Sequence, residues 1–170
     1  MITAQVLGIM AVIAFLLSFQ FKTRRNIILI NLSSRVLYIL QYIFLGAFEG
    51  AVLDFIGLIS SFVAKNKEKE NFIKYFKCFV FGIYTILIIA GILLYENIYS
   101  LFALLGIFFE ITALFLIREK NIRILSLISA PFWLVYNFAN SAYGSALGSV
   151  LVMISIIIAL YRLDYKKTRS

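Results

Sequence analysis

The chain has 170 residues, of which 63% are hydrophobic and 14% are charged, and its mean hydropathy is +1.00. Soluble globular domains carry roughly 45–50% apolar residues, so this composition excludes a soluble fold and predicts a membrane protein. The net charge of +8 is distributed in short basic clusters between apolar runs, which is typical of membrane topology signals and argues against a nucleic-acid-binding surface.

Seven apolar runs follow one another along the chain. A membrane-spanning helix needs about 20 predominantly apolar residues, and lipid offers no partner to an unpaired backbone amide, so we predict a helix for each run. The third run is short, and Ala47, Phe48 and Glu49 could extend its outer end. The predicted spans are Thr3–Phe21, Ile27–Gly46, Gly50–Ala64, Phe72–Tyr95, Ile98–Ile117, Ile124–Ala142 and Gly144–Tyr161.

The basic residues predict the orientation of these spans. Every lysine and arginine except Arg35 falls in or beside a connection on one side of the membrane, after the first, third, fifth and seventh spans. Because cytoplasmic loops carry an excess of Lys and Arg, we predict a cytoplasmic C-terminus and an N-terminus outside. The basic residues concerned are Lys22, Arg24, Arg25, Lys65, Lys67, Lys69, Lys74, Lys77, Arg118, Lys120, Arg123, Arg162, Lys166, Lys167 and Arg169.

The chain also contains an internal repeat. The segment Leu7–Ile56 aligns with Leu105–Ile154 without a gap, at an offset of about 98 residues. Spans one to three therefore match spans five to seven, and Phe72–Tyr95 has no partner. A repeat of three spans would be inverted in its second copy, and the single extra helix restores a parallel orientation. Matching pairs include Gly8 with Gly106, Arg25 with Arg123, Tyr38 with Tyr136, Gly46 with Gly144 and Gly50 with Gly148.

The predicted fold class is thus an all-α polytopic membrane protein, with seven transmembrane helices in a parallel 3+1+3 repeat. We divide the chain into a first triple-helix bundle over residues 1–66, a linker helix over 67–97 and a second bundle over 98–163. Residues 164–170 form a basic cytoplasmic tail that we expect to contact anionic lipid.

This repeat resembles the SWEET and PQ-loop superfamily of small transporters, and within it the YgjV-type bacterial inner membrane proteins. Gln20 lies where PQ-loop proteins have Pro-Gln before a basic loop. Asp54 stands three residues before Gly57, where the family often has Asn, and Trp133 lies where SWEETs place an aromatic platform. SWEET-like proteins usually carry several hinge prolines, whereas this chain has only Pro131. The resemblance implies gating or hinge roles for Gln20 and Pro131.

Three charged residues lie inside predicted spans. A charge at a helix centre costs at least about 2.5–3.5 kcal/mol on insertion scales, so such residues pair inside a bundle or line a watered cavity. Arg35 and Glu110 lie at similar depth, and Asp54 lies nearer the outside. One interpretation is a structural ion pair that locks three spans together. The other is a polar substrate site made of Arg35, Asp54 and Glu110.

The two copies of the repeat carry different residues at these charged positions, and this difference favours the substrate site over a structural ion pair. Arg35 aligns with Trp133, Asp54 with Val152 and Glu110 with Val12, so the two halves bring different chemistry to one place. Two roles are open for Trp133: stacking on a ring or sugar face, and plain packing. Asn137 and Asn140 lie one turn apart on the same helix face, and we include both among the substrate-binding candidates.

The resemblance implies a membrane transporter, a facilitator or exchanger of a small polar metabolite such as a sugar, with alternating access between the two bundles. The alternative is a non-transporting receptor or interaction protein of the PQ-loop type. With no histidine, one cysteine and no recognisable catalytic spacing, we expect no enzyme activity, no metal site and no cofactor. The expected location is the bacterial inner membrane, with a polar solute and lipids as partners and no nucleic acid. Formation of a homo-oligomer is left open.

Overall fold

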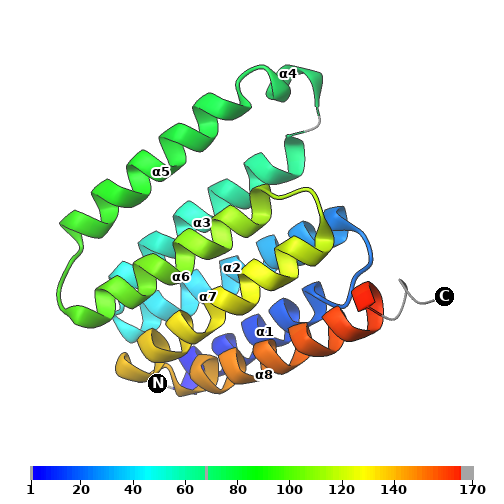
Figure 1. The fold of residues 1–170 in the computed structure, drawn as a ribbon. Helices are drawn as coiled ribbons and strands as arrows, with labels where there is room; N and C mark the ends of the chain where they lie inside the picture. The colour runs from blue at the N-terminus through cyan, green and yellow to red at the C-terminus, as the bar shows by residue number, and fades with distance from the viewer. Residues whose placement is uncertain (1, 68, 166–170) are drawn as a thin grey trace.

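The computed structural model describes residues 2–67 and 69–165, which form seven long helices and no β-strand (Figure 1). This confirms an all-α polytopic architecture. Lys166, Lys167 and Arg169 of the predicted tail lie outside the described residues. The helices are α1 (Ile2–Ser18), α2 (Arg24–Leu45), α3 (Phe48–Asn66), the one-turn α4 (Glu70–Ile73), α5 (Phe76–Leu93), α6 (Ile98–Phe115), α7 (Glu119–Ala139) and α8 (Tyr143–Ala159), which ends in a π-helical turn over Leu160–Tyr165.

Five helical segments of the described chain are long and apolar enough to cross a membrane: α2, α5, α6, α7 and Tyr143–Tyr165. The two remaining long helices, α1 and α3, do not meet these criteria of length and apolar composition. Helix α1 has 17 residues, and α3 carries Glu49, Asp54 and Lys65 in its sequence. Both lie alongside the other helices in the bundle (Figure 1).

The fourth predicted span is wrong at its start. Residues Phe72–Tyr95 were expected to form one helix, but the chain turns at Tyr75, where φ is −104° and ψ is 2°, and α5 begins only at Phe76. Charged ammonium groups prefer the polar boundary of a membrane. Lys69 and Lys74 flank the separate turn α4, and Lys77 lies in the first turn of α5, an arrangement expected of a segment at such a boundary. Helix α4 lies at an angle to α5 (Figure 1).

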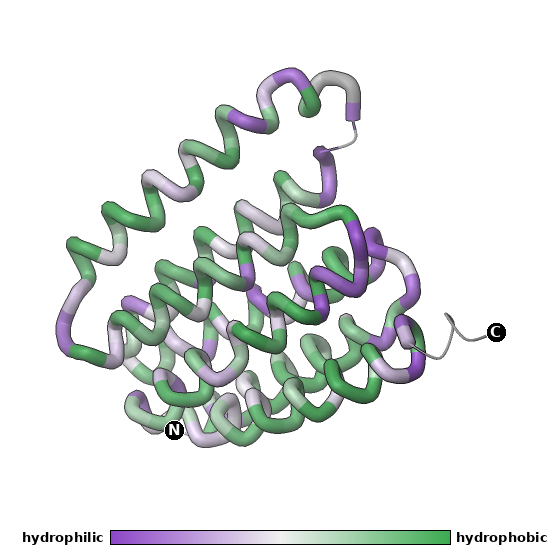
Figure 2. The backbone as a smooth tube through the Cα atoms, viewed as in Figure 1, coloured by the Kyte–Doolittle hydropathy of each residue, from purple (hydrophilic) through white to green (hydrophobic). Residues whose placement is uncertain are grey.

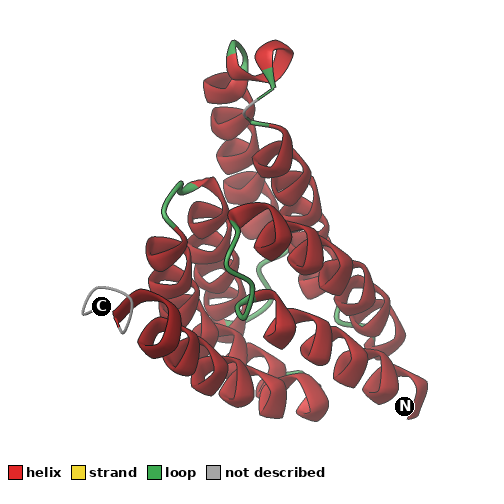
Figure 3. Cartoon of the chain, turned by 90° about the vertical axis from the view of Figure 1, so that its right-hand side faces the viewer, coloured by secondary structure: helices red, strands yellow, loops and turns green. Residues whose placement is uncertain are grey.

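The helices run as a parallel repeat requires. Helices α1, α3, α6 and α8 point in one direction and α2, α5 and α7 in the other, so the described ends of the chain lie at opposite ends of the bundle (Figure 1). Short loops join them, as the view turned by 90° shows (Figure 3). Within each half the second helix packs against the first and the third, and α1–α8 and α3–α6 contacts join the halves. In the repeat α1 corresponds to α6 and α3 corresponds to α8, so the α1–α8 and α3–α6 interfaces are equivalent. The helices other than α4 and α5 therefore form a ring with pseudo-twofold symmetry.

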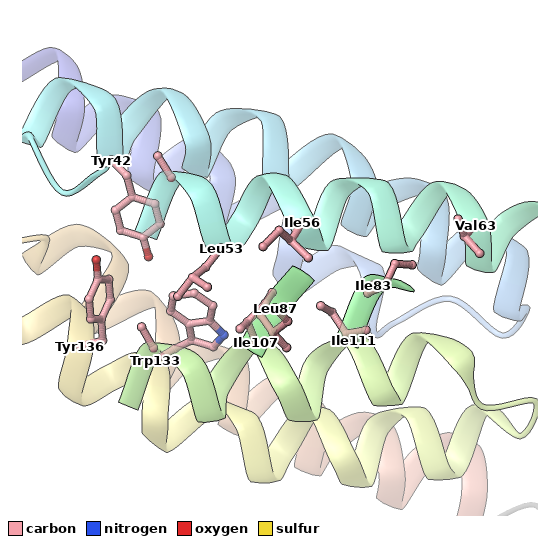
Figure 4. Close-up of a cluster of buried hydrophobic side chains, with 12 residues drawn as sticks. Tyr42, Leu53, Ile56, Val63, Ile83, Leu87, Ile107, Ile111, Trp133 and Tyr136 are labelled. Carbon is pink, nitrogen blue, oxygen red and sulfur yellow. The ribbon is translucent and has the colours of Figure 1, made fainter. Parts of the chain in front are cut away.

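Helix α5 lies outside this ring, against α3 and α6 (Figures 1 and 3). Its buried residues, Ile83 and Leu87, enter an apolar cluster with Ile107 and Ile111 of α6 (Figure 4). Phe76, Tyr84 and Ala90 pack beside this cluster, and the outer side of α5 is largely apolar and exposed, with Leu93 77% exposed. Exposed apolar sides with buried polar residues inside the bundle are expected of a protein whose solvent is lipid.

Polar residues gather at the two ends of the bundle (Figure 2). One end carries the α1–α2, α3–α5 and α6–α7 connections and the π-helical turn, with Lys22, Lys69, Arg118 and Arg162 among its residues. We call it the basic end. The opposite end carries the connections at Gly46–Ala47, residues 94–97 and residues 140–142, in which the described chain has no lysine or arginine.

Candidate functional site

A small cavity of about 40 Å³ lies inside the helix ring, and every helix of the ring contributes to its wall. A single buried water molecule requires roughly 10–15 Å³, so the cavity has room for only a few water-sized groups. Its lining residues are Phe15, Ser34, Arg35, Tyr38, Tyr42, Asp54, Glu110, Ser126, Ser129, Ala130, Trp133, Asn137, Ser149 and Val152.

Arg35 lies at the centre of a buried ion cluster in this wall. Its Nη1 donates to Asp54 Oδ1 at 2.7 Å, and its Nη2 lies 3.0 Å from Glu110 Oε1. Its Nε donates to Asn31 Oδ1 at 3.0 Å, one turn back along α2. The Nη2 contact is an ion pair without hydrogen-bond geometry, so Nη2 has no hydrogen-bond partner. The Arg35 side chain is 1% exposed, and the cluster joins α2, α3 and α6.

Local sequence explains how α2 and α3 build this cluster. Arg35, Tyr38 and Tyr42 are spaced by three and four residues, so they share the face of α2 that points inward. Gly57 on α3 leaves the space that the guanidinium occupies, since a Cβ at this position would overlap Arg35 Nη1. Small residues in membrane helices allow such close approaches.

Trp133 of α7 also contacts this ion cluster. Its Nε1 donates to Glu110 Oε2 at 3.0 Å, and its ring passes close to Gly106, where a Cβ would lie 3.1 Å from Trp133 Cδ1. Glu110 is therefore shared between Arg35 and Trp133. The two repeat partners Arg35 and Trp133 thus meet at one carboxylate.

Aromatic rings continue from Trp133 across the cavity. Tyr42 lies nearly parallel to both Trp133 and Tyr38, with ring centroids 6.4 Å apart in each pair. The Tyr42 hydroxyl donates to Asn137 Oδ1 at 2.7 Å, and Tyr136 packs edge-on against Tyr42 and Trp133 (Figure 4). These contacts tie the inner faces of α2 and α7 together.

The structure thus brings together five of the six predicted substrate-binding residues: Arg35, Asp54, Glu110, Trp133 and Asn137 all line the cavity. Asn140 is not among them. It follows the end of α7, and its Nδ2 donates to the backbone oxygen of Tyr136 at 3.1 Å. Helix α7 ends at Ala139, three residues before the predicted end, so Asn140 has left the helix face that it was expected to share with Asn137.

The two predicted gating or hinge residues lie apart from the cavity. Gln20 lies at the basic end, where its Nε2 donates to Ser155 Oγ of α8 at 2.7 Å and its Oε1 accepts from Arg162 Nη2 at 2.8 Å. Pro131 lies inside α7 with its side chain exposed, two residues before Trp133.

Arginines close the basic end more extensively than the sequence indicates. Arg123, 1% exposed, pairs with Asp164 at 2.8 Å and donates to the backbone oxygens of Phe19 and Phe21 at 3.3 and 2.8 Å. Arg24 donates to the backbone oxygens of Leu116 at 2.9 Å, Leu114 at 3.0 Å and Ala64 at 2.9 Å. Each arginine therefore contacts the end of one helix in each half. Arg24 binds at the ends of α6 and α3, and Arg123 binds at the end of α1 and at the π-helical turn after α8. We call Gln20, Arg24, Arg123, Arg162 and Asp164 the basic-end contacts.

Sequence reasoning missed Tyr42 and Arg123. Tyr42 carried a signal, because it continues the face of α2 defined by Arg35 and Tyr38. Arg123 carried none, since a basic residue beside a loop reads as a topology signal whether it is exposed or buried. The alignment pairs Arg123 with Arg25, which is exposed, while the equivalent contacts are made by Arg24.

Comparison with known proteins gives one match. A family model described as bacterial inner membrane protein, Imp-YgjV, matches residues 2–167. No curated protein and no solved structure matches the chain.

Proposed function

The chain belongs to the Imp-YgjV family of bacterial inner membrane proteins, and from this premise we propose that it transports a small polar solute across that membrane. It acts as a facilitator or exchanger, and the solute binds in the central cavity between the two triple-helix bundles. A sugar is one example of such a solute, suggested by the resemblance to SWEET and PQ-loop transporters.

The central cavity carries this proposal. Its wall combines Arg35 and Asp54 of the first half with Glu110, Trp133 and Asn137 of the second half. Intramembrane ionisable residues are expensive and mark substrate or ion pathways. Parallel-repeat transporters bind at the repeat interface near the bilayer midplane, and in our proposal the cavity between the two halves is the equivalent place. A structural ion cluster alone does not require the aromatic and amide groups that surround it.

Alternating access is supported by the contacts that close each end of the ring. The basic-end contacts join the halves at one end. At the opposite end Gln5 Oε1 accepts from the backbone N–H of Gly144 at 3.1 Å, and Ser145 Oγ donates to Gln41 Oε1 at 2.6 Å. With both ends closed, the small cavity corresponds to an occluded state, and solute enters when one set of contacts opens.

In our proposal the basic end faces the cytoplasm. Reporter fusions at the two termini test this orientation: a cytoplasmic N-terminus would contradict it.

Flux measurements in proteoliposomes test the transport function. We expect uptake of at least one solute from a labelled panel of sugars, amino acids, amines and nucleosides, and its loss in Arg35→Ala. Asn137→Ala should reduce flux about tenfold, a loss of about 1.4 kcal/mol of stabilisation. The matched control is Asn140→Ala, which changes the same residue type just after the end of α7, outside the cavity, and should transport normally.

Two results would contradict this function. Flux that is equal in the wild type, Arg35→Ala and Asn137→Ala would separate transport from the cavity. Flux no higher than in empty vesicles for the whole panel, together with retained solute binding, would favour the receptor alternative.

A further inference from the structure

The charges of the central site indicate its solute class. Resting on the transport role proposed above, we propose that the cavity binds a small organic cation, a protonated or quaternary amine, with its carboxylates as counter-ions and its aromatic rings as cation–π partners.

The cavity wall contains two acidic side chains and one basic side chain. Asp54 and Glu110 both contact the single guanidinium of Arg35, and all three residues are buried. The other lining residues are serine, tyrosine, asparagine and apolar side chains, which carry no charge at neutral pH. With both carboxylates ionised, the wall described here carries one net negative charge.

That excess charge is unfavourable unless one carboxylate takes up a proton or a cation enters the cavity. An uncompensated charge in a low-dielectric interior is strongly unfavourable, and the penalty falls when an opposite charge enters. The buried arginine at the basic end does not supply it, because Arg123 pairs with Asp164. A cation in the cavity would neutralise the excess and leave the Arg35 pairs intact.

The neighbouring aromatic rings suit the same ligand. Tyr38, Tyr42, Trp133 and Phe15 all line the cavity. Cations are attracted to the faces of tryptophan and tyrosine, most strongly where water is excluded, and aromatic cages recognise quaternary ammonium groups in this way. Trp133 also donates to Glu110, so the ring and the counter-ion belong to one rigid unit.

Arg35 itself is a poor receptor for an anion here. Its Nη1 and Nε already donate to Asp54 and Asn31, and Nη2 faces Glu110. An anionic solute would have to displace a carboxylate or lie beside both. A neutral sugar would satisfy the hydroxyl and amide groups but would not neutralise two ionised carboxylates.

The single tryptophan makes the test direct, because Trp133 is the only source of tryptophan emission and it lines the cavity. Purified protein is titrated with methylammonium, which suits the closed cavity, and with tetramethylammonium and choline, which require a more open state of the proposed cycle. Choline is paired with 3,3-dimethyl-1-butanol, its uncharged carbon isostere, and glucose and acetate serve as the neutral polar and anionic probes. We expect at least one cation to change Trp133 emission saturably, and choline to bind at least about tenfold more tightly than its isostere, a ratio that corresponds to about 1.4 kcal/mol.

Charge-neutralising variants give the second arm. Glu110→Gln keeps an acceptor for Trp133 but removes the excess charge, so cation affinity should fall about tenfold or more while binding of the isostere stays unchanged. Glu96→Gln removes the same charge at the exposed opposite end and should bind as the wild type does. Asp54→Asn repeats the test from the other carboxylate if Glu110→Gln fails to fold.

The outcomes separate this inference from the proposed function. If glucose or acetate changes the Trp133 emission and is transported, while no cation binds or is transported, then the inferred solute class is wrong and the transport function stands. Cation binding that is equal in Glu110→Gln and the wild type would also overturn the inference. If cations bind tightly but neither they nor any solute of the panel crosses the vesicle membrane, the cation site stands and transport fails.

Discussion

Gly57 determines where the Arg35 guanidinium can lie. Arg35 reaches from α2 toward α3 and α6, and its Nη1 occupies the space next to the Gly57 Cα. Any side chain at residue 57 would push the guanidinium away from Asp54 and Glu110. The pairing of a buried arginine with two carboxylates therefore depends on the absence of one methyl group on the facing helix.

The variant Gly57→Ala tests this dependence. We expect a loss of about 3–5 kcal/mol in unfolding free energy if the ion cluster breaks, because two buried carboxylates lose their partner. Thermal unfolding in detergent measures it, with Gly82→Ala as the control. A Cβ at Gly82 meets no atom within 4 Å, and alanine is a better helix former than glycine, so that variant should be as stable as the wild type or more so. An unchanged melting temperature in Gly57→Ala would show that the cluster tolerates displacement.

At the scale of elements, α7 is weakened at Pro131, and α2 carries a side-chain bond to its own backbone at the equivalent place. Pro131 has no N–H to donate to the backbone oxygen of Leu127. Its repeat partner Ser33 donates its hydroxyl to the backbone oxygen of Leu29, at 3.2 Å, and Leu29 is the repeat partner of Leu127. Both helices carry the residues that line the cavity a short distance beyond. A bend at these turns would move the Trp133 and Arg35 side chains relative to each other.

Pro131→Ala should stabilise α7 and slow its movement. Alanine restores one backbone hydrogen bond and removes the proline ring clash, which costs about 3 kcal/mol in a helix interior. We therefore expect a higher melting temperature with several-fold slower flux of a transported solute. Ser33→Ala is the control at the partner position, where the backbone ladder stays intact and both quantities should change little. A Pro131→Ala variant that melts lower, or that transports as fast as the wild type, would contradict a hinge role.

At the scale of the whole molecule, the halves are held together by polar contacts at both ends and by the ion cluster between them. Arg24 and Arg123 bind backbone oxygens near helix C-termini, where the negative end of the helix dipole favours a cation. Each reaches across to the other half, so the basic end opens only if these bonds break. The pseudo-twofold arrangement gives both halves the same kind of closure.

Arg123→Ala should open the basic end to water. The chain has one cysteine, the exposed Cys78, so Cys78→Ser provides a cysteine-free background, and Ser129→Cys then reports access to the cavity. We expect labelling of this cysteine by a water-soluble methanethiosulfonate to increase about tenfold in Arg123→Ala, as loss of about 1.4 kcal/mol of closure would produce. Arg118→Ala removes the same charge from an exposed position at the same end and should not change labelling. Equal labelling in all three proteins would show that the Arg123 contacts do not close the cavity.

The distribution of apolar runs and basic loops is sufficient to predict much of this fold. In a bilayer each apolar run must satisfy its own backbone as a helix, so the order of the elements and their parallel repeat can be read from the sequence. The predicted ends were less accurate. Helix α2 begins three residues early, at Arg24, because arginine is a good helix former, and Tyr75 interrupts the fourth run.

The residues of the candidate site were also predictable from the sequence only in part. Arg35, Asp54 and Glu110 were predictable as a group, because buried charges must pair and these three lie at compatible depths. The sequence alone determined the helical class, the repeat and this set of charges. Only the tertiary structure decided that one guanidinium serves both carboxylates, that Trp133 shares Glu110, that Asn140 lies outside the cavity and that Arg123 is buried. Helix rotation and the close approach allowed by Gly57 control those contacts, and they depend on neighbours that are distant in the sequence.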